Sequence, residues 1–243
     1  MHSKRLRLGL LTPSSNTALE PITAAMLSEL PHVSAHFARF KVTEIALSDH
    51  AIGQFHVSRI LAAAHQLADA RVDVIGWSGT SAGWLGFARD QALCRQITKA
   101  TGIPATTSVL ALNEIFEKTG VRRLGLVSPY TDDVQQRIVR NYEKLGIECV
   151  AERHLGLADN FSFADVADTQ LAMMMREAAF ARPDAVTTFC TNLHAAHLVR
   201  AFELATDIPV YDTVATVVWK ALTLLNVDTK PLARWGQLFA EVR

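Results

Sequence analysis

The sequence is poor in cysteine, and neither sign of charge is in excess. The three cysteines, Cys94, Cys149 and Cys190, are odd in number, lie far apart and form no CxxC pair. This spacing argues against a disulfide framework and against a structural zinc site. Lys and Arg together number 24, as do Asp and Glu, so the formal net charge is zero. Without a basic block, we expect neither nucleic acid nor a membrane surface as a partner.

Long apolar runs are also missing, although 49% of the residues are hydrophobic. No run approaches the roughly 18 residues that a membrane-spanning helix requires. The N-terminal stretch MHSKRLRLGLL is basic and then apolar, but its apolar part is short and runs into TPSSN without a cleavage signal. A strand is therefore expected there rather than a signal peptide. Together these absences predict a soluble, cytoplasmic protein with reduced thiols.

What the chain does have is a regular alternation of short apolar runs and amphipathic stretches. RLGLLTPSSN, VDVIGWSGTS, RLGLVSPYTDD and DAVTTFCTN are β-favouring runs that end in small polar residues. Among the stretches between them, QFHVSRILAAAHQLADA places apolar residues on one helix face, and DDVQQRIVRNYEKLG starts with acidic residues and stops at Gly146. This alternation predicts an α/β fold in which helices cover both faces of parallel strands.

The order of these runs repeats along the chain. RLGLLTPSSN resembles RLGLVSPYTD, VIGWSGTSA resembles VTTFCTNLH, and TGIPATTSV resembles TDIPVYDTV. Because the three pairs keep the same order and a similar offset, we predict two lobes of the same topology, each a doubly wound parallel sheet, related by a pseudo-two-fold axis. The first lobe is placed at residues 1–117 together with the C-terminal segment 226–243, and the second at residues 118–225.

The repeated loops are candidates for an active site in the cleft between the lobes. Ligands of open parallel sheets bind beyond the carboxyl ends of the strands, where each of these loops is expected. Cys190 ends its β run in the second lobe, whereas Gly79 occupies the corresponding position in the first. A helix dipole after Cys190 would lower the pKa of its thiol, which could then give or take a proton at carbon. Cys94 and Cys149 lie in helix-like and strand-like stretches, and we expect both to be structural.

Neutral hydrogen-bond donors fill the four loops, which contain no Arg or Lys. They are Ser14, Ser15, Asn16, Thr17, Ser78, Thr80, Ser81, Ser128, Tyr130, Thr131, Thr191 and Asn192. Together with backbone N–H groups at helix N-termini, such donors suit a carboxylate or a developing oxyanion. Ser, Thr and Asn are also favoured helix caps, so for any single one of these residues capping stays open as an alternative.

Two histidines after Cys190 leave a metal interpretation open. Cys190, His194 and His197 could form the ligand set of a zinc hydrolase, although no carboxylate lies near them in the sequence. The glycine patterns of nucleotide-binding loops, GxGxxG and GxxxxGK[ST], do not occur. We expect no metal and no other cofactor.

Several stretches together resemble the aspartate/glutamate racemase superfamily, in its maleate cis–trans isomerase and arylmalonate decarboxylase branch. LGLLTPSSNTALEP and FCTNL resemble the maleate isomerases, while GTS, TGIPATTSVLALNEIF, GVRRLGLVSPYTDDV and HLGLADN resemble both groups. The similarity extends from about Leu8 to Trp235. It implies a cofactor-independent enzyme that acts on a small carboxylic acid.

The resemblance also implies roles for individual residues. Racemases and maleate isomerases of the superfamily carry a first-lobe cysteine where this chain has Gly79, whereas the decarboxylase combines a glycine there with a second-lobe cysteine, here Cys190. Asn16 matches an asparagine that binds substrate carboxylate in the isomerases. The decarboxylase pattern further implies a cradle for one carboxylate and its enediolate. The members of this cradle are Thr80, Ser81, Tyr130 and the backbone of Thr191.

The missing first-lobe thiol narrows the expected reaction. Two-base racemisation and family-type maleate isomerisation both use that thiol, whereas decarboxylation through an enediolate needs only one proton donor, Cys190. Against this, Asp159 and Asn160 in LADNFSF weaken the apolar pocket that the decarboxylase uses. Two alternatives therefore stay open. One is a maleate isomerase- or racemase-type isomerase of a dicarboxylate or amino-acid derivative, as in ectoine catabolism, and the other is a non-catalytic protein that binds a small carboxylate.

The expected site combines one catalytic residue, Cys190, with a set of residues that bind the substrate or its oxyanion. This set consists of Ser14, Asn16, Gly79, Thr80, Ser81, Tyr130, Thr191 and Asn192. The expected partner is a small carboxylate substrate, and the sequence leaves a homo-oligomer open.

Overall fold

The computed structural model describes residues 5–242 and contains one parallel sheet in each half of the chain. The first sheet has the order β2-β1-β3-β4, and the second has the order β6-β5-β7. The strands are β1 (Leu6–Pro13), β2 (Val33–Phe40), β3 (Val74–Trp77), β4 (Ala105–Thr107), β5 (Arg123–Ser128), β6 (Glu148–His154) and β7 (Ala185–Thr188). Where β4 completes the first sheet, an isolated parallel bridge between Val186 and Val210 completes the second.

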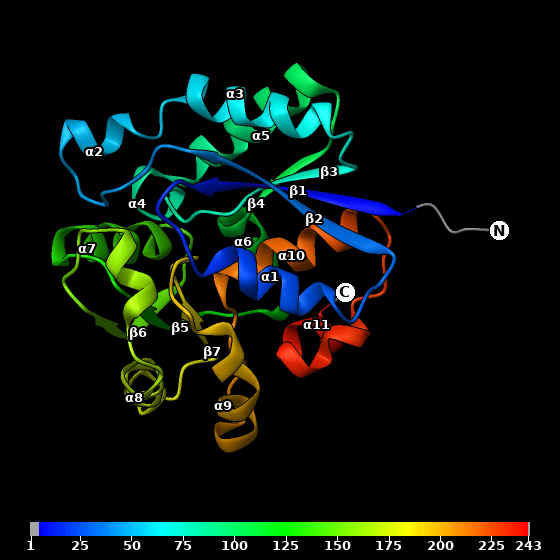
Figure 1. Cartoon of the computed structure of the whole chain (residues 1–243). Coiled ribbons are helices and arrows are strands. Elements are labelled where there is room, and N and C mark those ends of the chain that lie inside the picture. The colour runs from blue at the N-terminus through cyan, green and yellow to red at the C-terminus, as the bar shows by residue number, and fades with distance from the viewer. Residues whose placement is uncertain (1–4, 243) are drawn as a thin grey trace.

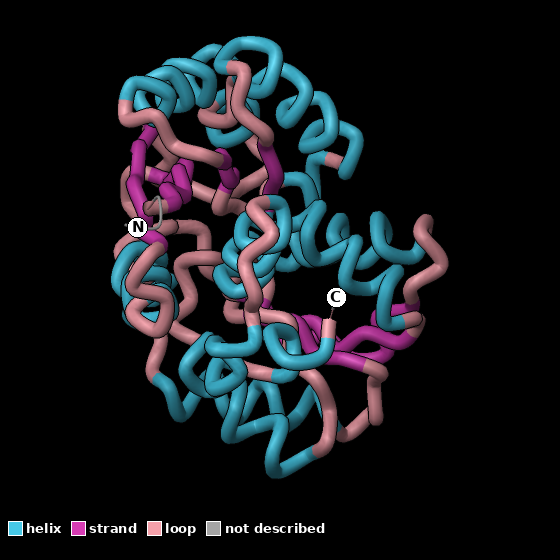
Figure 2. The backbone as a smooth tube through the Cα atoms, turned by 90° about the vertical axis from the view of Figure 1, so that its right-hand side faces the viewer, coloured by secondary structure: helices cyan, strands magenta, loops and turns pink. Residues whose placement is uncertain are grey.

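Helices connect the strands and separate the sheets. They are α1 (Leu19–Leu27), α2 (Asp49–Gly53), α3 (Val57–Asp69), α4 (Ala82–Leu85), α5 (Phe87–Thr101), α6 (Ser108–Thr119), α7 (Asp132–Glu143), α8 (Asp168–Ala179), α9 (Val199–Thr206), α10 (Thr213–Leu224) and α11 (Gln237–Glu241), with the 3₁₀ helices η1 (Phe161–Asp165), η2 (Ala196–Leu198) and η3 (Lys230–Trp235). In Figure 1, α3 and α5 cover one face of the first sheet, while α1, α6 and α10 lie between the two sheets. The view in Figure 2, turned by 90°, shows the same layers. The predicted α/β fold with two parallel-sheet lobes is confirmed.

The apolar periodicity of the sequence explains how the helices pack. In α3 the buried side chains are Ile60, Ala63, Ala64 and Leu67, which recur at the spacing of one helix face and pack toward β1 and β2. Helix α7 begins at Asp132, as predicted, and the chain leaves it through Gly146, whose φ of 74° lies in the left-handed region that glycine adopts without strain.

Strand register fixes which residues of the two lobes correspond. In the first sheet Leu11 of β1 lies opposite Trp77 of β3, and in the second sheet Val127 of β5 lies opposite Thr188 of β7. Leu11 and Val127 hold the same place in the repeated stretches RLGLL and RLGLV. Trp77 of the first lobe therefore corresponds to Thr188 of the second.

The correspondence continues into the loops after these strands. The N–H of Ser78 donates to the carbonyl of Leu11 at 3.1 Å, and the N–H of Phe189 donates to that of Val127 at 2.7 Å. One residue further on, Gly79 corresponds to Cys190. The sheets thus place the glycine of the first lobe where the second lobe has its cysteine.

The C-terminal segment packs against parts of both lobes. α11 contacts α10, and η3 contacts both α1 and α9. The indole N–H of Trp219 on α10 donates to the carbonyl of Val242 at 3.1 Å. The lobe boundaries near residues 117 and 225 stay a prediction. Within residues 5–242, none of the helices combines the length and the apolar character that crossing a membrane demands.

Candidate active site

The carboxyl ends of strands from both sheets meet at one small cavity. It is lined by Pro13, Val42, Ile45, Phe55, Trp77, Gly79, Thr80, Ser81, Trp84, Tyr130, Asn160, Cys190 and Thr191. Six of the nine residues predicted from the sequence are among them, and none of the lining side chains is charged. The cavity volume is about 20 Å³, whereas roughly 10–15 Å³ is enough for one water molecule. The two lobes are therefore closed on each other around this point.

A buried chain of hydrogen bonds joins the lobes at the cavity. The hydroxyl oxygens of Thr80 and Tyr130 lie 2.6 Å apart, and the Tyr130 hydroxyl is also hydrogen-bonded to the Cys190 sulfur. The backbone N–H of Asn192 donates to the same sulfur at 3.4 Å. Tyr130 and Cys190 are 2% and 3% exposed. The sulfur is thus hydrogen-bonded within the second lobe and is connected through Tyr130 to the first-lobe hydroxyl of Thr80.

Burial dominates the electrostatics of Cys190. It raises the pKa of the thiol from 9.0 to about 11, although hydrogen bonds from Tyr130 and from the backbone N–H groups of Asn192 and Leu193 act in the opposite direction. The prediction of a lowered pKa is wrong, because the sulfur is desolvated and a turn follows it, so that α9 begins only at Val199. At neutral pH the thiol keeps its proton, which suits a proton donor.

A buried carboxyl group acts on the thiol in the same direction. Asp212 is fully buried; its Oδ1 accepts the N–H groups of Val214 and Ala215, and its Oδ2 accepts the Thr188 hydroxyl at 2.6 Å. Desolvation raises the pKa of Asp212 to about 6. The carboxyl is therefore largely ionised at neutral pH, and its negative charge further raises the pKa of Cys190.

Each lobe also contributes a pair of backbone donors. Within the described residues, the N–H groups of Gly79 and Thr80 donate to no protein acceptor, and neither do those of the corresponding residues, Cys190 and Thr191. All four residues line the cavity. Unpaired N–H groups beside a small cavity are suited to the oxygens of a carboxylate or an enediolate.

Three predicted binding residues lie outside the cavity wall, and two of them connect the lobes instead. The Asn16 amide donates to the Thr191 hydroxyl at 3.2 Å, and Asn192 accepts the N–H of Thr17 at 2.9 Å. Ser14 exchanges hydrogen bonds with the backbone of Val42 in its own lobe. The expected contacts of Ser14, Asn16 and Asn192 with a substrate stay predictions.

Trp77 fills the place where a second thiol would project. A Cβ atom built on Gly79 would lie 2.1 Å from Cζ2 of the Trp77 indole, far closer than real Cβ contacts. Trp77 is 1% exposed, so its ring has little freedom to move aside. Thr188, which corresponds to Trp77, is much smaller and leaves room for the Cys190 side chain.

The aromatic and aliphatic wall of the cavity was not predicted from the sequence. The Phe55 ring meets those of Trp77 and Trp84 edge-on, with centroids 6.4 and 6.0 Å apart. Val42, Ile45 and Phe55 come from the segment after β2, which has no counterpart in the repeated stretches, so no sequence pattern marked them. This segment is tied to the second lobe, since the N–H of Ile45 donates to the carbonyl of Ala158 at 2.8 Å.

The polar residues of LADNFSF do not place a charge in the cavity. Asp159 is exposed, and its carboxylate accepts the N–H of Ser162 at the start of η1. Asn160 lines the cavity, but its amide donates to Ser15 Oγ at 2.7 Å and its backbone N–H donates to the carbonyl of Thr43 at 2.9 Å. The wall therefore stays largely apolar at this point.

Ser81 lies in a further pattern, since GTSAG at residues 79–83 fits the G-x-S-x-G sequence of serine hydrolases. The residue lines the cavity and follows a strand end. A nucleophilic serine needs an adjacent base, and no histidine is among the described residues that line the cavity. Ser81 therefore lacks, among these residues, the histidine of a triad, and its role in binding stays a prediction.

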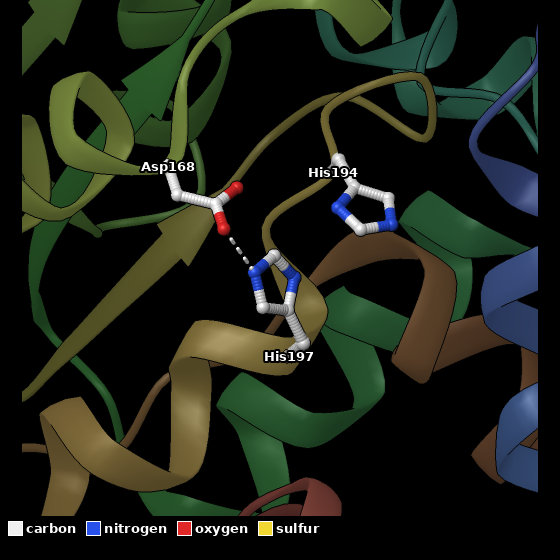
Figure 3. Close-up of side chains that lie close together, drawn as sticks. All are labelled: Asp168, His194 and His197. Carbon is white, nitrogen blue, oxygen red and sulfur yellow. Dashed lines mark hydrogen bonds and ion pairs between the residues drawn. The ribbon is translucent and has the colours of Figure 1, made fainter.

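The two histidines after Cys190 point to the surface, where they gather with a carboxylate. His194 and His197 are exposed, and His197 Nε2 lies 2.8 Å from Oδ2 of Asp168 (Figure 3). The group of side chains within reach of one ion is Asp168, His194 and His197, without Cys190. The zinc site of Cys190, His194 and His197 that the sequence left open is therefore not formed.

Solved structures of the same fold cover nearly the whole chain. A maleate isomerase from Pseudomonas putida S16 with maleate superimposes with a TM-score of 0.87 at 23% identity over 97% of both chains. The maleate cis–trans isomerase of Nocardia farcinica with a covalently bound succinylcysteine intermediate gives 0.88 at 23% identity, covering 98% of this chain and 99% of that one. Unliganded arylmalonate decarboxylase gives 0.79 at 22% identity, covering 97% and 99%.

Curated relatives bear the same two names. The maleate isomerase of Geobacillus stearothermophilus is 23% identical over 93% of this chain and 94% of its own length. The arylmalonate decarboxylase of Bordetella bronchiseptica is 24% identical over 96% of both chains. The family model described as arylmalonate decarboxylase matches residues 8–239. With the match spanning almost every described element, the chain belongs to the arylmalonate decarboxylase family.

Proposed function

We propose that the protein decarboxylates a small malonate-type acid without a cofactor and that Cys190 protonates the resulting enediolate. The observation that carries the proposal is a single thiol at the meeting point of the lobes, in an uncharged cavity where burial raises its pKa to about 11. A thiol that keeps its proton at neutral pH is ready to act as an acid.

The same observation disfavours the isomerase chemistry of some relatives. A cysteine that attacks carbon must do so as the thiolate, which a raised pKa makes scarce. Racemisation with two bases needs a second thiol, and the corresponding position is Gly79 beneath the Trp77 indole. Decarboxylation requires neither a nucleophilic thiolate nor a second thiol.

In the proposed reaction the protein residues bind the developing charge and deliver one proton. The C–C bond to one carboxylate breaks, its electron pair forms the enediolate, and carbon dioxide leaves. The unpaired N–H groups of Gly79, Thr80 and Thr191 hydrogen-bond the enediolate oxygens. The Cys190 S–H then donates its proton to the α-carbon, and Tyr130 hydrogen-bonds the thiolate until water reprotonates it.

Room for the substrate comes from a neighbouring cavity on the first lobe. This second cavity has a volume of about 170 Å³ and shares Phe55, Trp77 and Ser81 with the Cys190 cavity. An engineered apolar cavity of about 150 Å³ holds benzene, so a substituent of that size fits. Phe55 is half-buried in the turn after α2, and its displacement would join the two cavities.

The test is turnover in deuterated water with a panel of 2-substituted malonates and maleate. We expect carbon dioxide release and one deuterium at the α-carbon in a single configuration. Because one general acid contributes about 10²–10⁴-fold, Cys190→Ser should lower kcat by at least that range while malonate binding persists. Cys94→Ser, a half-buried thiol outside the cavity, is the matched control and should keep full activity.

Other results would select the alternatives. Formation of fumarate from maleate, with no carbon dioxide from any malonate, would favour an isomerase, to which the curated maleate isomerases lend support. Malonate binding without carbon dioxide or deuterium incorporation would favour a binding protein. Undiminished turnover by Cys190→Ser would remove the thiol from the mechanism.

A further inference from the structure

The surface group Asp168, His194 and His197 has the composition of a transition-metal site. One ligand atom from each residue, two imidazole nitrogens and one carboxylate oxygen, lies within 4.8 Å of the other two. The imidazole rings of His194 and His197 are 4.6 Å apart between centroids. Figure 3 shows the carboxylate of Asp168 facing the ring of His197, with the ring of His194 beside them.

The donor types select the class of ion. Imidazole nitrogens with a carboxylate oxygen suit Zn²⁺, Ni²⁺, Co²⁺ or Cu²⁺, whereas Mg²⁺ and Ca²⁺ prefer oxygen ligands alone. Zn²⁺ binds such atoms at about 2.0–2.2 Å, so the ligand atoms must shift from their present separations, which are 2.8 Å between Asp168 Oδ2 and His197 Nε2 and at most 4.8 Å within the group. Rotation of exposed side chains allows this, and three protein ligands leave a coordination position for water.

Chain connectivity gives such an ion a structural consequence. Asp168 is the first residue of α8, His194 ends the turn that begins at Cys190, and His197 lies in η2. The same turn contains Asn192, whose N–H donates to the Cys190 sulfur. An ion on this group would fasten the turn to α8.

We propose that Asp168, His194 and His197 bind one divalent transition-metal ion and that the ion ties the turn after Cys190 to the start of α8. The site is separate from the Cys190 cavity and does not depend on the decarboxylase proposal. Binding requires neutral imidazoles, so protons compete with the ion and affinity falls as the pH is lowered.

The test is calorimetric titration of the full chain, freed of metal by a chelator, with ZnCl₂, NiCl₂ and MgCl₂ at pH 7.5 and pH 5.5. We expect one Zn²⁺ or Ni²⁺ per chain at pH 7.5, weaker binding at pH 5.5, no binding of Mg²⁺, and a higher thermal midpoint with Zn²⁺. Asp168→Asn, His194→Gln and His197→Gln should each weaken Zn²⁺ binding at least tenfold. His65→Gln, an exposed histidine on α3, is the matched control and should bind as the parent chain does.

Two outcomes would overturn the proposal. One is the absence of stoichiometric Zn²⁺ binding up to millimolar concentration. The other is a doubly substituted chain, His194→Gln with His197→Gln, that still binds one ion with the parent affinity, which would place the ion on a thiol or elsewhere. Imidazole ¹⁵N chemical shifts of the unsubstituted chain give a separate reading, because only coordinated His194 and His197 should shift with added Zn²⁺.

Discussion

In the first lobe β3 ends in Trp77 and the chain continues to Gly79, while in the second lobe β7 ends in Thr188 and the chain continues to Cys190. The backbones match in register, and in both lobes two loop residues have N–H groups at the same cavity that donate to no acceptor in residues 5–242. The side chains differ because a large indole covers one position and a small threonine leaves the other open. Duplication of the backbone thus preserves two sets of anion-binding donors, while side-chain size decides which lobe can hold a thiol.

The two lobes also differ in how they hold a buried aspartate. Asp90 interacts with the hydroxyl of Thr107, which caps α6, and its Oδ2 has no hydrogen-bond partner among the described residues. Asp212 itself caps α10 and accepts the hydroxyl of Thr188. The helix cap is thus a threonine in the first lobe and an aspartate in the second, and the first-lobe carboxylate is left with fewer donors.

The largest expected difference concerns the pH dependence of stability at these two carboxyls. Burial raises the pKa of Asp90 from 3.8 to about 7 and that of Asp212 to about 6. A carboxyl group whose pKa is higher in the folded than in the unfolded state makes its full contribution to stability below the unfolded pKa. This contribution is lost as the pH rises through the folded pKa. Ionisation of Asp90 should therefore lower the free energy of unfolding by about 4 kcal/mol between pH 4 and pH 8.

Urea unfolding between pH 4 and pH 8 measures this effect. Asp90→Asn should remove the part of the decline in unfolding free energy that comes from Asp90. Asp212→Asn should remove a smaller part, about 3 kcal/mol. Equal pH profiles for the parent chain and Asp90→Asn would contradict a pKa of Asp90 that burial raises.

A second prediction concerns the thiol that only the second lobe carries. With its pKa near 11, Cys190 should alkylate about 100-fold more slowly at pH 8 than a thiol of pKa 9. Peptide mass spectrometry after iodoacetamide treatment follows Cys190 separately from Cys94 and Cys149. The rate should rise tenfold per pH unit from pH 7 to pH 9.5, whereas a plateau below pH 8 would contradict the protonated-donor role.

A third prediction concerns the hydroxyl chain that connects the lobes. Tyr130→Phe removes the donor that stabilises the Cys190 thiolate and leaves Thr80 without its 2.6 Å partner. We expect kcat to fall by about 10–100-fold, since a hydrogen bond to a charged group is worth about 1.5–3 kcal/mol. The pKa of Cys190 measured by alkylation should rise further. Thr80→Val, which keeps Tyr130 in place, should have the smaller effect on that pKa.

The smallest expected effect comes from giving the first lobe a thiol. Gly79→Cys should destabilise the fold by about 1–3 kcal/mol, the usual cost of overpacking, because its Cβ would meet the Trp77 indole. In the doubly substituted chain, Trp77→Thr with Gly79→Cys, the clash is absent, so the two changes should cost less than their sum.

The same pair of variants tests the symmetry of the cleft. Both variants carry a thiol in each lobe, but in the doubly substituted chain the Trp77 indole no longer occupies the space beside position 79. That chain should therefore scramble the configuration of a chiral product in deuterated water faster than Gly79→Cys alone. Single-configuration product from that chain, with both thiols alkylatable, would mean that positions 79 and 190 do not face one substrate.

The sequence by itself determined the architecture and the chemical asymmetry of this protein. The repeated stretches predicted two parallel-sheet lobes and indicated that Gly79 of the first corresponds to Cys190 of the second, which agrees with the strand register. Period and order are properties of the chain, so they can be read without coordinates. The hydroxyl-rich loops at the strand ends were predicted for the same reason.

Only the tertiary structure decided how those residues behave. Desolvation raised the pKa of Cys190 against the prediction, because burial depends on every element packed around the sulfur. Asn16 and Asn192 proved to bridge the lobes, and Phe55 reached the cavity from a segment outside the repeat. Contacts between residues more than a hundred positions apart arise from packing, and no local pattern in the chain records them.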